Sequence, residues 1–323
     1  MGKVTVLRAG PLTTVQDLGR RGQRALGVSA GGALDLEAAR LANLLVGNSI
    51  ASALLEVALG GVRLRFDEAR RVAWAGGNFD LQIAETRIPA GRSAIVRPGE
   101  ELRIGGAKSG CRLWLAISGG IEVPAILGSR ATDLRAHFGG FAGRALQDGD
   151  ELSLGEATPP AEEAARIASW GAIPEWSLTA TPTPILRVVR GAEWEMFGRQ
   201  ARHSFLETAF TVGAQADRMG VRLEGAVLAR KKKRELLSEA VAPGTVQVAN
   251  DGQPILLLGD CQTIGGYPKI AHVITVDLAP AAQLQPNDTV RFEEVSPEIA
   301  AALFQEREND LQLFQVGLSL RTG

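Results

Sequence analysis

The sequence predicts a mainly β protein, made of two related β-barrel units with a few helices. Polar and apolar residues alternate over many short segments, and glycine is abundant (38 of 323 residues) while aromatic residues make up only 5%. The second half of the chain also repeats motifs of the first half in the same order. Short strands joined by tight glycine turns are typical of barrels, whose closure removes exposed sheet edges.

The internal repeat consists of four pairs of motifs. In the first pair, Asp35 and Asp217 are each followed five residues later by Arg-Leu. The matched segments are 35–41 with 217–223, 54–56 with 236–239, 119–126 with 265–270, and 146–154 with 284–292. A duplicated unit fixes where domain boundaries are sought. We therefore expect a first barrel unit with its N-terminal loop and helix over 1–155, and a second barrel unit over 185–295.

Hydrophobic periodicity places the individual elements. Alternation of period 2 predicts half-buried strands over 62–66, 80–83, 101–104, 151–154 and 289–292. Continuous apolar residues over 112–117 and 254–258 predict strands covered on both faces. Leucines at helical spacing, followed by Gly47, predict a helix over 34–46.

Two further segments lie outside the barrels. Five prolines interrupt 156–184, a spacing that a central strand does not tolerate, so this segment is predicted to be a linker with a short helical patch over 161–170. Ser296 is a predicted N-cap and Pro297 the first helical residue of a C-terminal helix over 296–323.

Composition excludes several classes of partner. Lys plus Arg (35) nearly balances Asp plus Glu (36), so no strong field attracts nucleic acid or anionic lipid. The longest apolar runs fall far short of the roughly 18 residues that span a bilayer. No leader precedes Val4, and Cys111 and Cys261 are too few for a disulfide framework. We expect a cytoplasmic protein with two buried thiols and neither nucleic-acid nor membrane partners.

Familiar catalytic motifs are missing from the sequence. The nearest match to a phosphate-binding loop, 105–109, lacks the glycine before Lys108 and precedes a predicted strand. The three histidines have no metal-ligand spacing, so no metal site is expected. No GxSxG motif is present. The basic run 230–234 is interpreted as a solvated loop tip.

Two polar clusters are candidate sites with an equally plausible structural interpretation. In the loop 13–22, Asp17 and Arg20 could bind a carboxylate or amide ligand, or Asp17 could cap the loop and pair with Arg20. In the segment 215–220, Gln215, Asp217 and Arg218 could contribute to a site, or form a structural Asp–Arg pair.

A third cluster is the strongest candidate, because it joins a buried strand to the next strand and is rich in hydrogen-bond donors. Glycines allow a ligand to approach the backbone, and the cluster holds the only tyrosine of the chain. Such donors suit an oxyanion or a ureido carbonyl. Its candidate residues are Gln262, Thr263, Gly265, Gly266, Tyr267 and Lys269.

At these motifs the chain resembles the KipA family, also called allophanate hydrolase subunit 2. That family includes the C subunit of bacterial 5-oxoprolinase and part of the carboxyltransferase region of urea carboxylase. The matching segments, which together cover roughly 3–294, are 9–22, 40–48, 119–130, 215–220, 238–247 and 262–271. The family pattern is altered at Ser29, Gly31, 76–78 and 132–134.

The resemblance implies two cyclophilin-like β-barrels and a polypeptide that is inactive alone. With two partners, a KipI-like B subunit plus an A subunit, it would open 5-oxoproline to L-glutamate, with ATP bound by the complex. The amides of Gln262, Gly265 and Gly266, with Thr263, would polarise the substrate carbonyl. As catalytic residues, Lys269 and Arg218 would neutralise negative charge, and Asp217 or Asp17 would orient them or move a proton.

Two other functions stay open at the level of sequence. One is a carboxyltransferase or allophanate hydrolase-type subunit that acts on urea-like amides, using carboxybiotin supplied by another chain, since this sequence has no Met-Lys-Met biotinylation stretch. The other is a non-catalytic, KipA-like binding protein that antagonises a kinase inhibitor.

Overall fold

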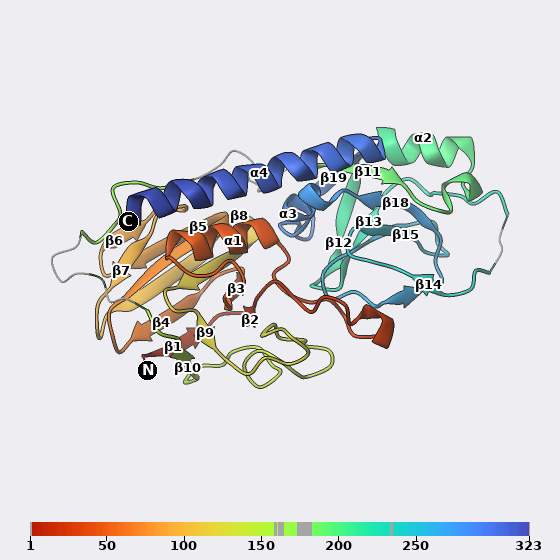
Figure 1. Cartoon of the computed structure of the whole chain (residues 1–323). Helices are drawn as coiled ribbons and strands as arrows, with labels where there is room; N and C mark the ends of the chain where they lie inside the picture. Colours follow the sequence, from red (N-terminus) through yellow and green to blue (C-terminus); the bar gives the residue numbers. More distant parts are fainter. Residues whose placement is uncertain (1, 158–159, 161–164, 173–182, 233–234, 323) are drawn as a thin grey trace. The chain divides into compact units, whose positions relative to one another are not determined.

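The structure is a computed structural model that describes residues 2–157, 160, 165–172, 183–232 and 235–322. The chain divides into two compact units, each with its own β-sheet (Figure 1). The first contains Met1–Arg20, Gly31–Ala180 and Gln315–Gly323, and the second contains Arg21–Ala30 and Thr181–Phe314. The short segment Arg21–Ala30 thus groups with the second unit.

The first unit is built on a ten-stranded sheet, in which neighbouring strands pair antiparallel in the order β2-β3-β8-β4-β1-β10-β9, while β5 pairs with β6, β7 and β8. Its strands are β1 (Lys3–Ala9), β2 (Leu12–Gln16), β3 (Leu54–Ala58), β4 (Val62–Phe66), β5 (Arg70–Ile83), β6 (Thr86–Ile88), β7 (Ala94–Val96), β8 (Glu101–Ile117), β9 (Ile121–Glu122) and β10 (Glu151–Leu154). In β4 every second residue is buried, as alternation predicts.

Strand β8 unites two segments that the sequence predicts as separate strands. The alternating residues 101–104 and the apolar run 112–117 lie in one strand, because glycines and polar residues between them continue to pair with β5 across several register shifts. The apolar half is buried on both faces, with helix α1 (Leu36–Leu45) packed against β5 and β8. Asp35 caps α1 by accepting a hydrogen bond from Ala38 N at 2.8 Å.

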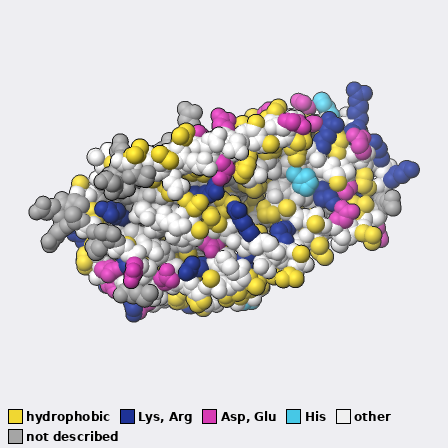
Figure 2. Space-filling view, viewed as in Figure 1, with side chains coloured by type: hydrophobic (Ala, Val, Ile, Leu, Met, Phe, Trp, Pro, Cys, Tyr) yellow, Lys and Arg dark blue, Asp and Glu magenta, His cyan; other side chains and the backbone are white. Residues whose placement is uncertain are grey.

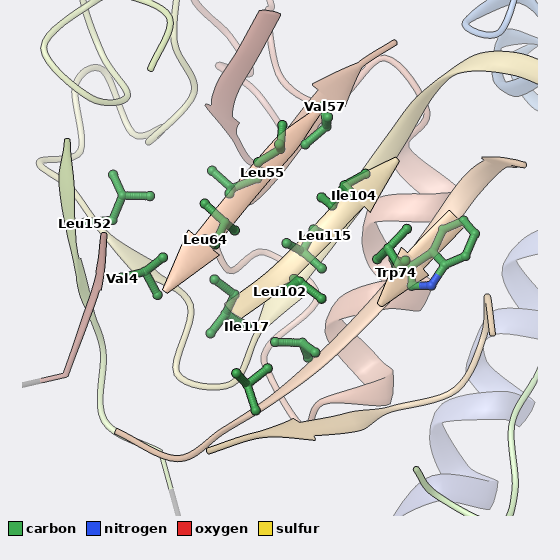
Figure 3. Close-up of a cluster of buried hydrophobic side chains, with 14 of the residues drawn as sticks. Val4, Leu55, Val57, Leu64, Trp74, Leu102, Ile104, Leu115, Ile117 and Leu152 are labelled. Atoms are coloured by element: carbon green, nitrogen blue, oxygen red, sulfur yellow. The ribbon is translucent and has the colours of Figure 1, made fainter. Parts of the chain in front are cut away.

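The core of the first unit lies on one face of this sheet. Side chains from β1, β3, β4, β5, β8 and β10 converge there (Figure 3), among them Val4, Leu64 and Leu115, which are fully buried. Removing such residues from water is the main favourable contribution to folding, at about 25 cal/mol per Å² of apolar surface.

The second unit is a closed barrel with the strand order β11-β18-β15-β16-β13-β12-β19. The parallel pairing of β11 with β19 closes it, so no barrel strand presents a free edge. The barrel strands are β11 (Ile185–Arg190), β12 (Phe210–Ala216), β13 (Gly220–Glu224), β15 (Thr245–Val248), β16 (Pro254–Leu257), β18 (Lys269–Val273) and β19 (Thr289–Glu294). The predicted fold class, mainly β with two barrel-like sheets, is confirmed.

Helices and a small ribbon complete the second unit. Helix α2 (Arg199–Glu207) packs on β19, where Phe205 stacks on Phe292 with ring centroids 4.5 Å apart. Outside the barrel, β14 (Glu239–Ala240) pairs with β17 (Ile264–Gly265), and α3 (Leu278–Ala281) is a short helix.

The helical patch predicted within the linker is wrong in its described part, whereas the predicted C-terminal helix is observed. Residues 161–164 of the predicted helical patch lie outside the described residues. Ile167 bridges to Ala94, which an antiparallel extended segment does and a helix does not, so a helix there is wrong. Helix α4 (Pro297–Thr322) begins after Ser296, whose Oγ accepts from Ile299 N at 3.3 Å as an N-cap does. In the part of the chain that the structure describes, no helix is both long and apolar enough to cross a bilayer.

The viewed surface has charges of both signs. Figure 2 shows Lys and Arg side chains interspersed with Asp and Glu, in keeping with the formal net charge of −1. The two cysteines are buried free thiols, as predicted, and burial raises the pKa of the Cys261 thiol.

Candidate functional site

A cavity of about 670 Å³ opens in the second unit. This volume lies within the range of small-molecule sites, roughly 300–1,000 Å³. Four residues of the predicted donor cluster line it, together with residues from β15 and from the loops that precede β14 and β16. The described lining residues are Arg230, Glu235, Leu236, Gln247, Asn250, Gln262, Gly265, Gly266 and Tyr267.

The ribbon formed by β14 and β17 makes one wall of the cavity. Glu239 pairs with Gly265 in its register, and Val241 N donates to Thr263 O at 3.0 Å. Because Gly265 lacks a side chain, the ribbon lies close to the buried amide of Gln247. A Cβ at Gly265 would come within 2.8 Å of Gln247 Nε2.

Gln247 organises the amide groups at this wall. It is buried on β15, and its Nε2 donates to Tyr267 O at 3.1 Å. Its Oε1 accepts a long contact from Gln262 Nε2 at 3.5 Å. Tyr267 keeps 39% of its surface exposed. The arrangement therefore presents amide and phenol groups on a backbone that neighbouring strands hold in place.

Lys269 lies on β18 beside this wall, and its ammonium is held by two carboxylates. Nζ is 2.6 Å from Glu239 Oε2 and 3.5 Å from Glu193 Oε1. Burial lowers the pKa of Lys269, but the hydrogen bond and charge of Glu239, with the charge of Glu193, outweigh it and raise the pKa above its usual value. The ion pair links the barrel strand β18 to the ribbon strand β14.

The cluster around Arg218 is also engaged in structural contacts. The guanidinium forms a buried, two-point ion pair with Asp260, with Nε–Oδ2 at 2.8 Å and Nη2–Oδ1 at 3.0 Å. Asp217 Oδ1 accepts from Met219 N at 2.7 Å and closes the turn before β13. Gln215 is exposed on β12. Arg218 thus forms a structural Asp–Arg pair. Its partner is Asp260, which lies in the loop before β17.

Asp17 and Arg20 belong to the first unit, where both are buried. Asp17 accepts from Ser129 Oγ at 2.6 Å and from Gly19 N at 2.8 Å. The Arg20 guanidinium donates to Ala131 O and lies 4.4 Å from the ring centroid of Phe138. These contacts attach the loop after β2 to the irregular segment 129–138.

Other predicted features have clear positions. Residues 105–109 lie inside strand β8, so their backbone is extended and does not form a phosphate-binding loop ahead of a helix. Within the described ranges, no group of three His, Cys, Asp or Glu residues is placed to hold a metal ion.

Sequence reasoning missed five lining residues: Arg230, Glu235, Leu236, Gln247 and Asn250. The basic run 230–234 is a signal for Arg230, but its pattern predicts a solvated loop tip. In the structure Arg230 is only half-exposed and lies on the cavity wall, so that interpretation is wrong for this residue.

Comparison with known proteins agrees with this fold. The family model described as "Carboxyltransferase domain, subdomain A and B" matches residues 26–294. The chain belongs to this family, and the predicted resemblance is confirmed.

Within the family, the relatives include the C subunit of 5-oxoprolinase from Escherichia coli, 37% identical over 94% of this chain and 94% of that protein. The protein of the same name from Haemophilus influenzae is 36% identical, with 97% of each chain covered. Among solved structures, the urea amidolyase of K. lactis superimposes with a TM-score of 0.89 at 29% identity over 97% of this chain. This chain covers 20% of that much longer one.

We expect Gly265→Ala to disturb the cavity more than the fold. The new Cβ displaces the Gln247 amide and breaks its bond to Tyr267 O, which costs about 1 kcal/mol of stability. Urea denaturation checks this loss against Gly106→Ala, a position with no atom within 4 Å of a new Cβ. Equal stability of the two variants would contradict the prediction.

The lowered pKa of His272 predicts that folding stability depends on pH. Burial, and then the charge of Lys269, lower the pKa of His272 below its usual 6.5. Below that pH the unfolded chain binds a proton that the folded chain does not, so stability present above about pH 6.5 declines as the pH falls. Denaturation at pH 7, 6 and 5 should show a smaller decline for His272→Asn than for His203→Asn, which changes an exposed histidine. Parallel pH profiles would contradict this.

Proposed function

We propose that this chain is the C subunit of a 5-oxoprolinase-type complex that opens 5-oxoproline to L-glutamate with ATP. The observation that carries the proposal is the 37% identity to the C subunit of a 5-oxoprolinase, over 94% of both chains. A cavity of suitable size, whose lining includes the amides of Gln247, Asn250 and Gln262, supports it. We place the complex, which would also contain a KipI-like B subunit plus an A subunit, in the cytoplasm.

The cavity residues have chemistry that suits a lactam. Ring opening breaks the bond between the carbonyl carbon and nitrogen, the carbon gains the hydroxyl of water, and the nitrogen gains a proton. Negative charge develops on the carbonyl oxygen, which N–H donors stabilise best when they are fixed in advance. Gln262, Gly265 and Gly266 line the cavity and would supply such donors.

Charged residues that are not among the described lining residues of the cavity have proposed roles that depend on their charge. Lys269 and Arg218 would contribute positive charge to the site from positions fixed by carboxylates, and Asp217 would orient the turn before β13. Thr263 would support the ribbon through its carbonyl. Asp17, Arg20 and Gln215 remain proposed substrate-binding residues for the assembled enzyme.

ATP would supply the free energy that opens the stable lactam ring. The extended backbone of 105–109 does not fit a phosphate group, so in this proposal the nucleotide is bound by another polypeptide of the complex.

Reconstitution of the complex tests the proposal. The chain by itself should release no glutamate from 5-oxoproline. Together with both partners and ATP, it should release glutamate. Lys269→Ala should lower that turnover, and thermal unfolding of the same variant separates a lost function from a lost fold. Full turnover by Lys269→Ala would contradict the role of this residue, and absent turnover by the wild-type complex would contradict the function.

A carboxyltransferase acting on urea-like amides is the second candidate. It is favoured by the TM-score of 0.89 with the urea carboxylase of Kluyveromyces lactis, over 97% of this chain. The same amide donors could hold a ureido oxygen, and carboxybiotin would have to come from another chain. Transfer of the labelled carboxyl group from added carboxybiotin to urea by the reconstituted complex would support this candidate.

A further inference from the structure

We infer that the cavity of the second unit recognises a small lactam that bears a carboxylate, and that Arg230 is the residue that selects the carboxylate. This inference rests on the proposed function and goes further, because it names the residue that distinguishes this substrate from one without a carboxylate. The argument starts from the charges on the cavity wall. Among the described lining residues, Arg230 is the one cation and Glu235 the one anion, while the others are neutral.

The backbone that carries Arg230 is fixed to neighbouring segments. Arg230 bridges to Phe197, which is fully buried, and Lys231 N donates to Met196 O at 2.8 Å. On the preceding side, Leu228 N donates to Gly252 O at 3.0 Å. The backbone of Arg230 therefore has a defined position, although Arg230 is the first residue of a basic run.

The Arg230 side chain is oriented by the cavity wall. Its Nη2 donates to Asn250 Oδ1 at 3.2 Å, and Asn250 also lines the cavity. A half-buried guanidinium is more weakly hydrated than an ammonium, and its planar fork matches the two oxygens of a carboxylate. The neighbouring Lys231 is exposed, so the two cations of this segment differ in environment.

Alongside Glu235, the cavity thus combines a cation with a cluster of amides. A ligand that pairs with both needs a carboxylate and an amide within one small molecule. 5-Oxoproline has this combination, whereas urea has the amide groups without a carboxylate. The position of Arg230 on the wall distinguishes the two candidate substrates in a way that the amide donors do not.

The test compares two lactams on the reconstituted complex with ATP: 5-oxoproline, and 2-pyrrolidinone, which has the same ring without the carboxylate. In Arg230→Gln, we expect kcat/KM for 5-oxoproline to fall 10- to 100-fold, mainly through a higher KM, as expected for a lost charge-assisted hydrogen bond. Activity on 2-pyrrolidinone should change less than about twofold. Arg230→Lys should restore part of the loss, and the matched control Lys231→Gln should behave as wild type.

The outcomes separate the inference from the function on which it rests. If the wild-type complex does not process 2-pyrrolidinone, the KM for 5-oxoproline decides: a raised value in Arg230→Gln supports the inference. An unchanged KM, or an equal loss on both lactams, overturns it. A wild-type complex that releases no glutamate from 5-oxoproline refutes the proposed function instead.

Discussion

Asp260→Asn should destabilise the second unit by about 3–5 kcal/mol, the usual result of removing one partner of a buried ion pair. Asp260 and Arg218 are both less than a tenth exposed and are joined by two short bonds. The neutral amide leaves the buried guanidinium without its compensating charge. Asp260 N also donates to Arg218 O at 3.0 Å, so the loop before β17 and the turn before β13 should loosen together.

Hydrogen exchange read by mass spectrometry measures this loss within the second unit. Peptides that cover 217–224 and 254–261 should lose protection first. The control is Glu195→Gln, which removes a carboxylate from the exposed pair with Arg202 and should change stability by less than about 1 kcal/mol. If Asp260→Asn and Glu195→Gln exchange alike, the pair does not hold these loops.

Gln262→Leu should lower kcat of the assembled enzyme about 100-fold, as the loss of one hydrogen-bond donor to a developing oxyanion does. Leucine has a similar volume, so the cavity keeps its shape and loses only the amide. Gln262 is half-buried and makes just a long contact to Gln247, so we expect little change in folding stability.

The comparison variant for Gln262→Leu is Gln200→Leu, on the exposed side of α2. This variant makes the same chemical change at a residue that lies far from the cavity residues in the sequence. It should leave kcat unaltered. Thermal unfolding of both variants excludes a general loss of fold. A kcat within about twofold of wild type for Gln262→Leu would show that this amide does not act on the reacting carbonyl.

Local pattern was sufficient to predict much of the fold. The alternation in 62–66 and 289–292 shows directly as β4 and β19, because a strand with one buried face must repeat with period 2. The capping chemistry of Ser296 likewise marked where α4 begins, whereas the predicted start of the first helix at 34 lies two residues before α1, whose N-cap is Asp35. Pattern failed at β8, where polar residues inside a long strand resembled a break between two strands.

The candidate site was predictable only in part, because it is made by pairings across long sequence separations. The loop 262–267 has its own signature of glycines and donors. Gln247 gives no such signal, and it reaches the cavity only because β15 pairs with β18. Lys269 could be identified as a polar residue near the loop, but its carboxylate partners lie 30 and 76 residues away. Strand register, which periodicity leaves open, decides these contacts.

The most direct test of the account is a structure of the reconstituted complex with 5-oxoproline and a non-hydrolysable ATP analogue. We expect the lactam in the cavity of the second unit, with its carbonyl near Gln262 and Gly265 and its carboxylate on Arg230. 5-Oxoproline bound at a site that contains none of these residues would contradict the account.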